Sequence, residues 1–81
     1  MDGGEDRANV LSKQIIGCTL TVLNALGAGF LEKVYENALV LELRKAGLAV
    51  SQQHRMVVRY EGSVVGDYTV DLLVEDIVLV E

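Results

Sequence analysis

The 81-residue sequence contains no proline and only one cysteine. The absence of proline counts against a linker and against an all-β fold rich in turns. Cys18 has no second cysteine with which to form an internal disulfide or a zinc site, and it lies within an apolar helical pattern. We therefore predict that Cys18 packs in the core of a protein that resides in the reducing cytoplasm.

Long hydrophobic runs and a secretion signal are also missing. The longest apolar runs are far too short to cross a bilayer, and the first residues, MDGGEDRAN, are acidic and polar where a signal peptide would be basic and then apolar. We therefore expect neither export nor contact with a membrane. Hydrophobic residues make up 51% of the sequence and charged residues 23%, which is typical of a globular protein, and the length predicts one domain over residues 1–81.

Lysine and arginine are absent from the last part of the sequence, residues 61–81. The acids of this part are Glu61, Asp67, Asp71, Glu75, Asp76 and Glu81. The net charge of −5 counts against tight, sequence-independent binding to nucleic acid, because neutralisation of phosphates supplies most of that affinity. Four cations in the middle segment can still form a local basic surface. Nucleic acid is therefore kept as a weak candidate partner. The cations of that segment are Arg44, Lys45, Arg55 and Arg59.

Helical spacing of apolar residues predicts a first helix from Asn9 or Val10. It should end near Leu26, because Gly27-Ala28-Gly29 supplies flexible positions for a C-cap and a tight reversal. We expect residues 1–8 to be frayed. The predicted apolar stripe consists of Leu11, Ile15, Cys18, Val22 and Ala25, widened by Ile16, Leu20 and Leu23.

A second helix is predicted from about Phe30 to Gly47. Arg44 and Lys45 near its end suit the negative C-terminal end of a helix dipole. The spacing of the apolar residues predicts which side of this helix faces the core. The positions expected there are Leu31, Val34, Tyr35, Ala38, Leu39 and Leu41.

Two acids of the second helix approach its packed side. An advance of about 100° per residue places Glu42 near the middle of the apolar stripe and Glu32 on its margin. A partly buried ion pair between Glu42 and an arginine, such as Arg55 or Arg59, explains Glu42 as well as any chemical role does. Both interpretations stay open on the sequence alone.

The period of the pattern changes to two after Gly47. Residues 50–60 alternate between a mostly apolar face and a basic face, which indicates a strand. The turn 61–63 connects it to a second strand over residues 64–74, and 75–76 leads into a third. Two helices packed on three antiparallel strands make a two-layer α+β domain.

His54 is the only histidine, and it lies on the apolar face of the first predicted strand. It could act as a metal ligand or a base. A lone histidine on such a face is more often a hydrogen-bonded structural residue, and we favour that interpretation.

Asp71 and Glu81 are the candidate metal ligands, because a carboxylate in an apolar strand must be paired, protonated or bound to a metal. A two-residue turn at 75–76 would place them on opposite faces of the sheet. A turn with an odd number of residues, or a bulge, would put Asp71 opposite Leu79 and make the acids diagonal neighbours on one face. Only that register permits a shared hard cation such as Mg²⁺. The alternative is that both acids lie on the solvent face of a half-buried hairpin.

The segment Gly29-Phe30-Leu31-Glu32-Lys33-Val34-Tyr35 resembles the pattern that names the GxxExxY protein family. Asp71, followed after an apolar hairpin by Glu81, is similar to the acidic pair of the PD-(D/E)XK nuclease superfamily, to which that family is assigned. The resemblance runs from about Ile15 to the last residue.

The resemblance implies a Mg²⁺-dependent phosphodiesterase with a partial PD-(D/E)XK nuclease-like core, and Mn²⁺ is the alternative ion. Asp71 and Glu81 would hold the metal, Glu32 would join from the helix, and Tyr35 would orient or pack beside the site. The superfamily motif continues to a lysine two residues after its Glu, where the lysine helps to position water or stabilise charge. Because this sequence stops at Glu81, we expect a C-terminally truncated core with weak or no activity.

The alternative function is a non-catalytic module that forms a homodimer or binds a partner through a degenerate nuclease fold. A sheet that ends on its third strand leaves an edge unpaired and an apolar face uncovered, and both features favour self-association. We therefore expect a homo-oligomer formed through the edge or the face of the sheet.

Overall fold

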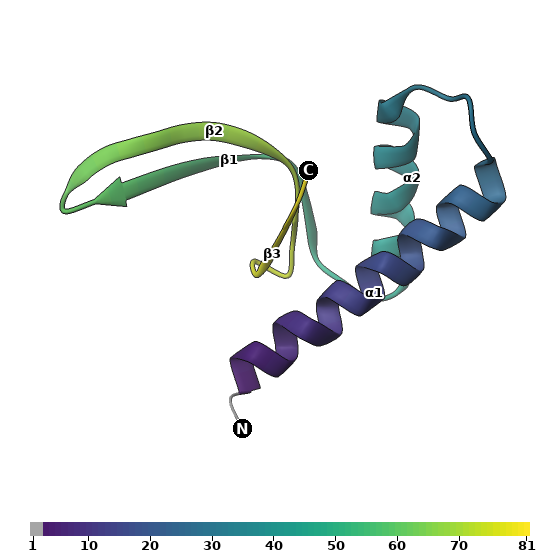
Figure 1. Ribbon diagram of the computed structural model, residues 1–81, viewed down its shortest axis with the longest axis horizontal. Coiled ribbons are helices and arrows are strands. Elements are labelled where there is room, and N and C mark those ends of the chain that lie inside the picture. The colour runs from purple at the N-terminus through teal and green to yellow at the C-terminus, as the bar shows by residue number, and fades with distance from the viewer. Residues whose placement is uncertain (1–2) are drawn as a thin grey trace.

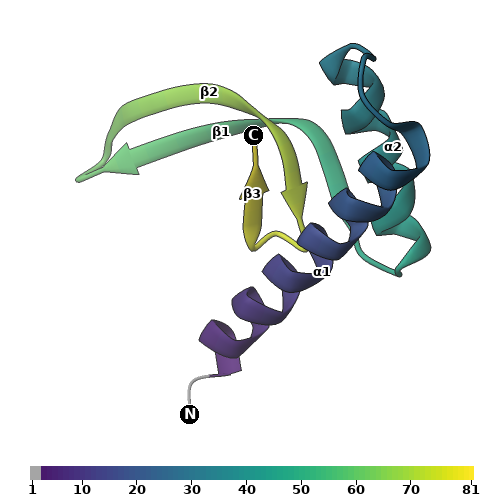
Figure 2. The same ribbon diagram turned by 45° about the vertical axis from the view of Figure 1, so that its right-hand side comes forward.

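The computed structural model describes residues 3–81, with side chains from residue 6 onward. The three strands form one antiparallel sheet in the order β1-β2-β3. Both helices lie near the base of the sheet, while the β1–β2 hairpin projects away from them (Figure 1, Figure 2). This arrangement confirms the predicted α+β fold class. Along the chain the elements are α1 (Gly3–Leu26), α2 (Glu32–Lys45), β1 (Val50–Tyr60), β2 (Ser63–Val74) and β3 (Val78–Val80).

α1 begins at Gly3, earlier than the start near Val10 that the apolar pattern predicts. Residues 3–8 are helical and not frayed, and the rest of the stretch expected to fray lies outside the described residues. The Arg7 guanidinium binds the Glu75 carboxylate at 2.5 Å, which ties the start of α1 to the turn after β2. A local apolar pattern cannot reveal such a long-range contact. As far as the described residues extend, neither helix is long and apolar enough to cross a membrane.

The core lies where the two helices meet the base of the sheet. α1 buries its predicted stripe at three positions, and Cys18 packs against the cluster while partly buried. Ile16, Leu20 and Leu23 remain about half exposed, because α1 is covered by α2 and β3 along a narrow stripe only. The buried cluster consists of Leu11, Ile15, Val22, Leu39, Val40, Leu43, Leu48, Leu72 and Val74.

The buried side of α2 is rotated from the predicted one. Leu39 is buried as expected, and Val40 and Leu43 are buried although the pattern did not select them. α2 contacts α1 on one side and β1 on the other, so the covered stripe lies between these two contacts. Apolar residues surround this helix, and their spacing alone does not specify which of them face the core. The predicted core positions that are exposed instead are Leu31, Val34 and Leu41.

β1 and β2 pair along nearly their whole length, with a register shift between Val58 and Arg59. Gln53 has a φ of 53°, a left-handed conformation that interrupts the ladder near the base of the hairpin. We call the distal part of the hairpin, residues 55–69, the arm. The remaining described chain, residues 3–54 and 70–81, is the root.

Candidate functional site

The turn between β2 and β3 sets the relation between the two candidate metal ligands. Leu72 pairs with Val80, so the next position along this register places Asp71 opposite Glu81 on one face of the sheet. The turn is therefore of odd length, as the metal hypothesis requires, but Asp71 lies opposite Glu81 itself and not opposite Leu79. The three turn residues are Glu75 (φ 54°), Asp76 (φ 57°) and Ile77.

A pocket of about 150 Å³ lies between α1, α2 and the ends of β2 and β3. Apolar side chains from both helices and the sheet form much of its wall. Asp71 is partly buried there, whereas Glu32 and Glu81 are exposed. The structure thus brings together all four residues that the sequence singled out, from segments far apart in the chain. The polar and aromatic lining residues are Thr19, Glu32, Tyr35, Glu36, Asp71 and Glu81.

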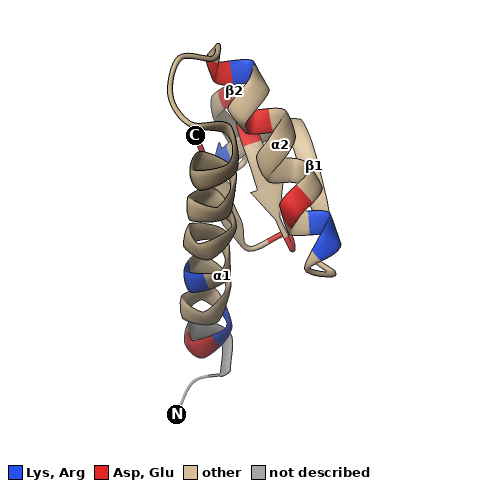
Figure 3. Ribbon diagram, turned by 90° about the vertical axis from the view of Figure 1, so that its right-hand side faces the viewer, with Lys and Arg blue, Asp and Glu red and all other residues tan. Residues whose placement is uncertain are grey.

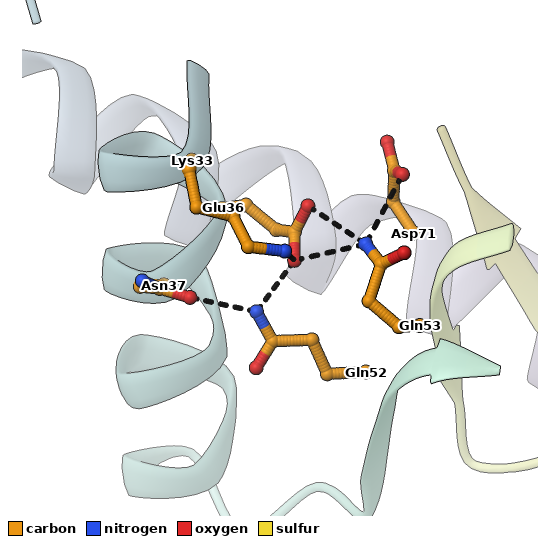
Figure 4. Close-up of polar contacts among 6 residues, drawn as sticks. All are labelled: Lys33, Glu36, Asn37, Gln52, Gln53 and Asp71. Carbon is orange, nitrogen blue, oxygen red and sulfur yellow. Dashed lines mark hydrogen bonds and ion pairs between the residues drawn. The ribbon is translucent and has the colours of Figure 1, made fainter. Parts of the chain in front are cut away.

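Glu36 is a pocket acid that was not among the predicted site residues. Its side chain is 11% exposed, and it accepts hydrogen bonds from Lys33 Nζ at 2.9 Å and Gln52 Nε2 at 2.5 Å. Gln53 Nε2 lies 3.3 Å from both Glu36 carboxylate oxygens and 3.4 Å from Asp71 Oδ1 (Figure 4). One amide nitrogen therefore bridges the carboxylates of α2 and β2.

The left-handed backbone at Gln53 explains how two consecutive glutamines reach the same helix. Side chains alternate between faces in a regular strand, yet Gln52 and Gln53 both bond Glu36. Gln52 also donates to Asn37 Oδ1 at 2.7 Å (Figure 4). The positive φ breaks the alternation, and nothing in a Gln-Gln pair signals it beforehand. The role of Glu36 therefore could not be found by assigning faces to the strand.

The pocket gathers carboxylates from α2, from β2 and from the end of the sequence. The hydrogen bond from Gln52 is the main reason that the pKa of Glu36 lies below its ordinary value; Lys33 and Gln53 lower it further, and partial burial opposes them. Glu36 is therefore ionised at neutral pH. Figure 3 shows both acidic and basic residues on α2, whereas α1 is uncharged beyond its first half. Carboxylates gathered in this way attract cations and repel free phosphate groups.

Tyr35 holds the backbone of the loop between α1 and α2. Its hydroxyl donates to the Gly27 carbonyl at 2.6 Å and accepts from the Phe30 amide at 3.2 Å, and its ring meets that of Phe30 edge to face with centroids 6.2 Å apart. Gly29 has a φ of 105°, a conformation that glycine adopts most readily. Glu32 is the first residue of α2, where a negative charge is favoured by the helix dipole.

Glu42 is not paired with Arg55 or Arg59, as one interpretation of the sequence had it. It binds Lys45 one turn later, at 2.9 Å, and lies close enough to Cys18 to raise the pKa of that thiol, an effect smaller than that of burial. Arg55 instead pairs with Asp67, within the arm. That interpretation is wrong, because the helix carries its own cation, Lys45, three residues after Glu42.

His54 is held by a neighbour on its own strand. Its Nδ1 lies 2.9 Å from the Ser51 hydroxyl oxygen, and the ring is partly buried. This agrees with the hydrogen-bonded structural role favoured for the histidine. His54 does not line the acidic pocket.

The pocket acids suit a hard divalent cation that keeps several waters. Mg²⁺ and Mn²⁺ prefer carboxylate, carbonyl and water oxygens, and one or two protein carboxylates often suffice. Over the described side chains, no group of three or more His, Cys, Asp and Glu is close enough to hold an ion. Asp71 and Glu81 lie opposite each other at the pocket and form a pair of carboxylates of the kind that such an ion binds.

The family model of the PD-(D/E)XK nuclease superfamily matches residues 9–81, a range that includes most of α1 and every other element. The chain belongs to this superfamily. Its two helices and three-stranded antiparallel sheet are consistent with a partial PD-(D/E)XK core, and nucleases of the superfamily typically use divalent metal ions. None of the curated proteins and none of the solved structures compared with the chain matches it.

Proposed function

We propose that this PD-(D/E)XK domain binds a divalent cation, Mg²⁺ or Mn²⁺, through Asp71 and Glu81 for the hydrolysis of phosphodiester bonds. The observation that carries the proposal is the three-residue turn, which places these two acids opposite each other at one pocket. Superfamily membership supports the class of reaction. The carboxylate donors support the class of ion.

The residues around the acid pair have distinct supporting roles in this proposal. A bound divalent cation supplies an activated water and stabilises the charge that develops on a phosphate oxygen. Gln53 orients the Asp71 carboxylate and links it to Glu36, while Glu32 contributes a further carboxylate at the pocket. Tyr35 positions the loop that begins α2.

Nucleic acid is the proposed substrate, and its binding depends on the cation. The net charge of −5 and the acids of the pocket oppose the approach of a phosphodiester. A divalent cation between Asp71 and Glu81 neutralises their two charges and offers open coordination positions to a phosphate oxygen. We therefore expect weak binding of DNA or RNA without added metal and stronger binding with it.

Within the superfamily, we propose membership of the GxxExxY family. The supporting residues have structural reasons to be what they are: Gly29 adopts a positive φ, and the Tyr35 hydroxyl holds the backbone of the loop at both Gly27 and Phe30. Glu32 begins α2 and reaches the pocket. The motif thus shapes the entrance to the site.

Titration calorimetry with Mg²⁺ and with Mn²⁺ tests the metal site. Asp71→Asn should weaken binding at least about tenfold, because a neutral amide replaces a charged ligand. Asp76→Asn is the matched control, since Asp76 is exposed, lies outside the pocket and has a left-handed backbone that asparagine tolerates. Equal heats from the wild type and both variants would remove the metal assignment.

Cleavage of labelled DNA and RNA oligonucleotides tests the reaction separately. We expect slow cleavage that requires added Mg²⁺ or Mn²⁺, is lost in Asp71→Asn and persists in Asp76→Asn. Metal binding without cleavage would instead support the second candidate, a non-catalytic binding module. That candidate is favoured by one observation, the exposed apolar side chains of the arm.

A further inference from the structure

The two faces of the arm differ in chemistry. The β1–β2 register places Met56, Val58 and Tyr68 on one face, and β1 alternation adds Tyr60 beyond the register shift. A Cβ atom on Gly66 would lie 3.5 Å from Val58 Cβ and 3.7 Å from Tyr68 Cε1, so these side chains flank the glycine on that face. We call this surface the apolar face. The opposite, charged face carries Arg55, Val57, Arg59, Val64, Asp67 and Thr69.

The apolar face is exposed despite its composition. Val58, Tyr60 and Tyr68 are 39%, 66% and 45% exposed. Neither helix covers the arm in either ribbon view (Figure 1, Figure 2). A two-stranded ribbon with one apolar and one charged face normally has the apolar face packed against something, because a solvated hairpin is marginally stable alone.

The surface area indicates how large the missing contact is. The chain exposes 5600 Å², whereas a compact monomer of 8.8 kDa is expected to expose about 4,800 Å². Its radius of gyration is 14.5 Å, against about 12 Å for a compact domain of this length. The excess over the whole molecule, about 800 Å², is comparable with the share of one partner in a standard protein–protein interface.

The distribution of charge indicates which partner fits. The arm contains two cations, Arg55 and Arg59, and two anions, Glu61 and Asp67, so its formal charge is zero and the whole charge of −5 lies in the rest of the chain. Two copies repel each other through their acidic parts, and the arm is the region where they can meet without that cost. The apolar face itself carries no charge and so complements a second identical face, as a two-fold contact requires.

We propose that two copies of this chain dimerise by packing the apolar faces of their arms against each other. Face packing fits better than edge pairing, because the register shift between Val58 and Arg59 interrupts the regular ladder within the arm and makes it a poorer template for a further strand. The proposal does not depend on the metal site. The pocket is lined by root residues alone, so this contact leaves both pockets open.

Sedimentation equilibrium over a concentration series tests the dimer with a matched pair of variants. Val58 on the apolar face and Val57 on the charged face are neighbours of the same type with similar exposure, 39% and 44%. Val58→Lys should weaken dimerisation on the order of 100-fold, because it places two unpaired ammonium groups in the contact. Val57→Lys should leave the dissociation constant unchanged within about threefold.

Circular dichroism of both variants checks that the fold is retained. A wild-type protein that stays monomeric at every concentration would overturn the proposal and leave the face to a different protein or to a segment outside this sequence. Equal weakening by the two substitutions would also overturn it, because the contact would then not be confined to the apolar face.

Discussion

The root and the arm are stabilised by different kinds of interaction. The root joins segments far apart in the chain, through a buried apolar cluster and through polar links such as Arg7 to Glu75 and Gln53 to the acids of the pocket. In the arm, β1 and β2 pair with each other, and the exposed bidentate pair of Arg55 and Asp67 joins them at 2.8 and 2.6 Å. The carboxylates of the pocket therefore lie where long-range contacts fix them, whereas the arm presents an exposed surface.

The largest difference between buried and exposed positions should appear at two leucines of α2. Leu43 is fully buried and Leu41 is 63% exposed. Leu43→Ala should lower the free energy of unfolding by about 3 kcal/mol, through lost transfer energy and the cavity left behind. Leu41→Ala should change it by less than about 0.5 kcal/mol. Urea unfolding measures the free energy of unfolding of both variants. Equal losses would contradict the assignment of Leu43 to the buried side of α2 and of Leu41 to its exposed side.

A smaller loss is expected at the link between the two ends of the root. Glu75 accepts from the Arg7 guanidinium and from the Ala49 backbone amide, each at 2.5 Å, and its side chain is 22% exposed. Glu75→Gln keeps an acceptor but removes the charge, and it should cost about 1 kcal/mol. A double-mutant cycle with Arg7→Gln isolates the ion pair. Strictly additive effects would show that the pair contributes nothing.

The pH dependence of stability should reveal the polar network of the pocket. The folded pKa of Glu36 lies below the ordinary value of an unfolded chain, first because of the hydrogen bond from Gln52. Its contribution is therefore complete above the ordinary glutamate pKa and is lost as the pH falls through the folded pKa. Gln52→Ala should raise the pKa of Glu36, measured by carbon NMR of the carboxyl group. Asn37→Ala keeps the Gln52 donor and should leave that pKa nearly unchanged.

The smallest effect on stability is expected in the arm. Arg55 is the cause of the lowered pKa of Asp67, yet both side chains are well exposed, at 70% and 47%. Arg55→Gln should return the pKa of Asp67 toward its ordinary value without a measurable change in the urea midpoint. A clear shift of the midpoint would show that the ion pair of the arm stabilises the whole fold. That result would contradict the conclusion that the buried contacts of the root stabilise the protein.

Periodicity predicted part of the site. A two-residue alternation in β2 and β3 makes the relative direction of Asp71 and Glu81 depend only on turn length. Turn length is the quantity that local pattern leaves open. Glu75 and Asp76 both adopt left-handed conformations, and Ile77, an apolar residue suited to a strand, belongs to the turn. The sequence could therefore state only that the two acids share a face if the turn has an odd length. The structure shows that it does.

Other features depend on contacts that no local pattern contains. The core side of α2 is decided by how α1 and β1 cover it, so Leu43 could not be separated from Leu41 by spacing alone. Glu36 lies one turn after Glu32 on α2, and its link to Asp71 exists because a left-handed residue in β1 turns a second glutamine toward that helix. The fold class was easier to predict. Two amphipathic helical stretches followed by stretches of alternating apolar and polar residues are compatible with few architectures.

The left-handed residue in β1 makes two geometric quantities vary together. The φ of Gln53 helps to set the angle at which the arm leaves the root, and its amide nitrogen spaces the carboxylates of Glu36 and Asp71. Relaxing that residue to an ordinary extended backbone would redirect the arm and, in the same motion, withdraw the donor that both carboxylates share. The orientation of a protruding hairpin and the separation of two acids are thereby coupled through one torsion angle.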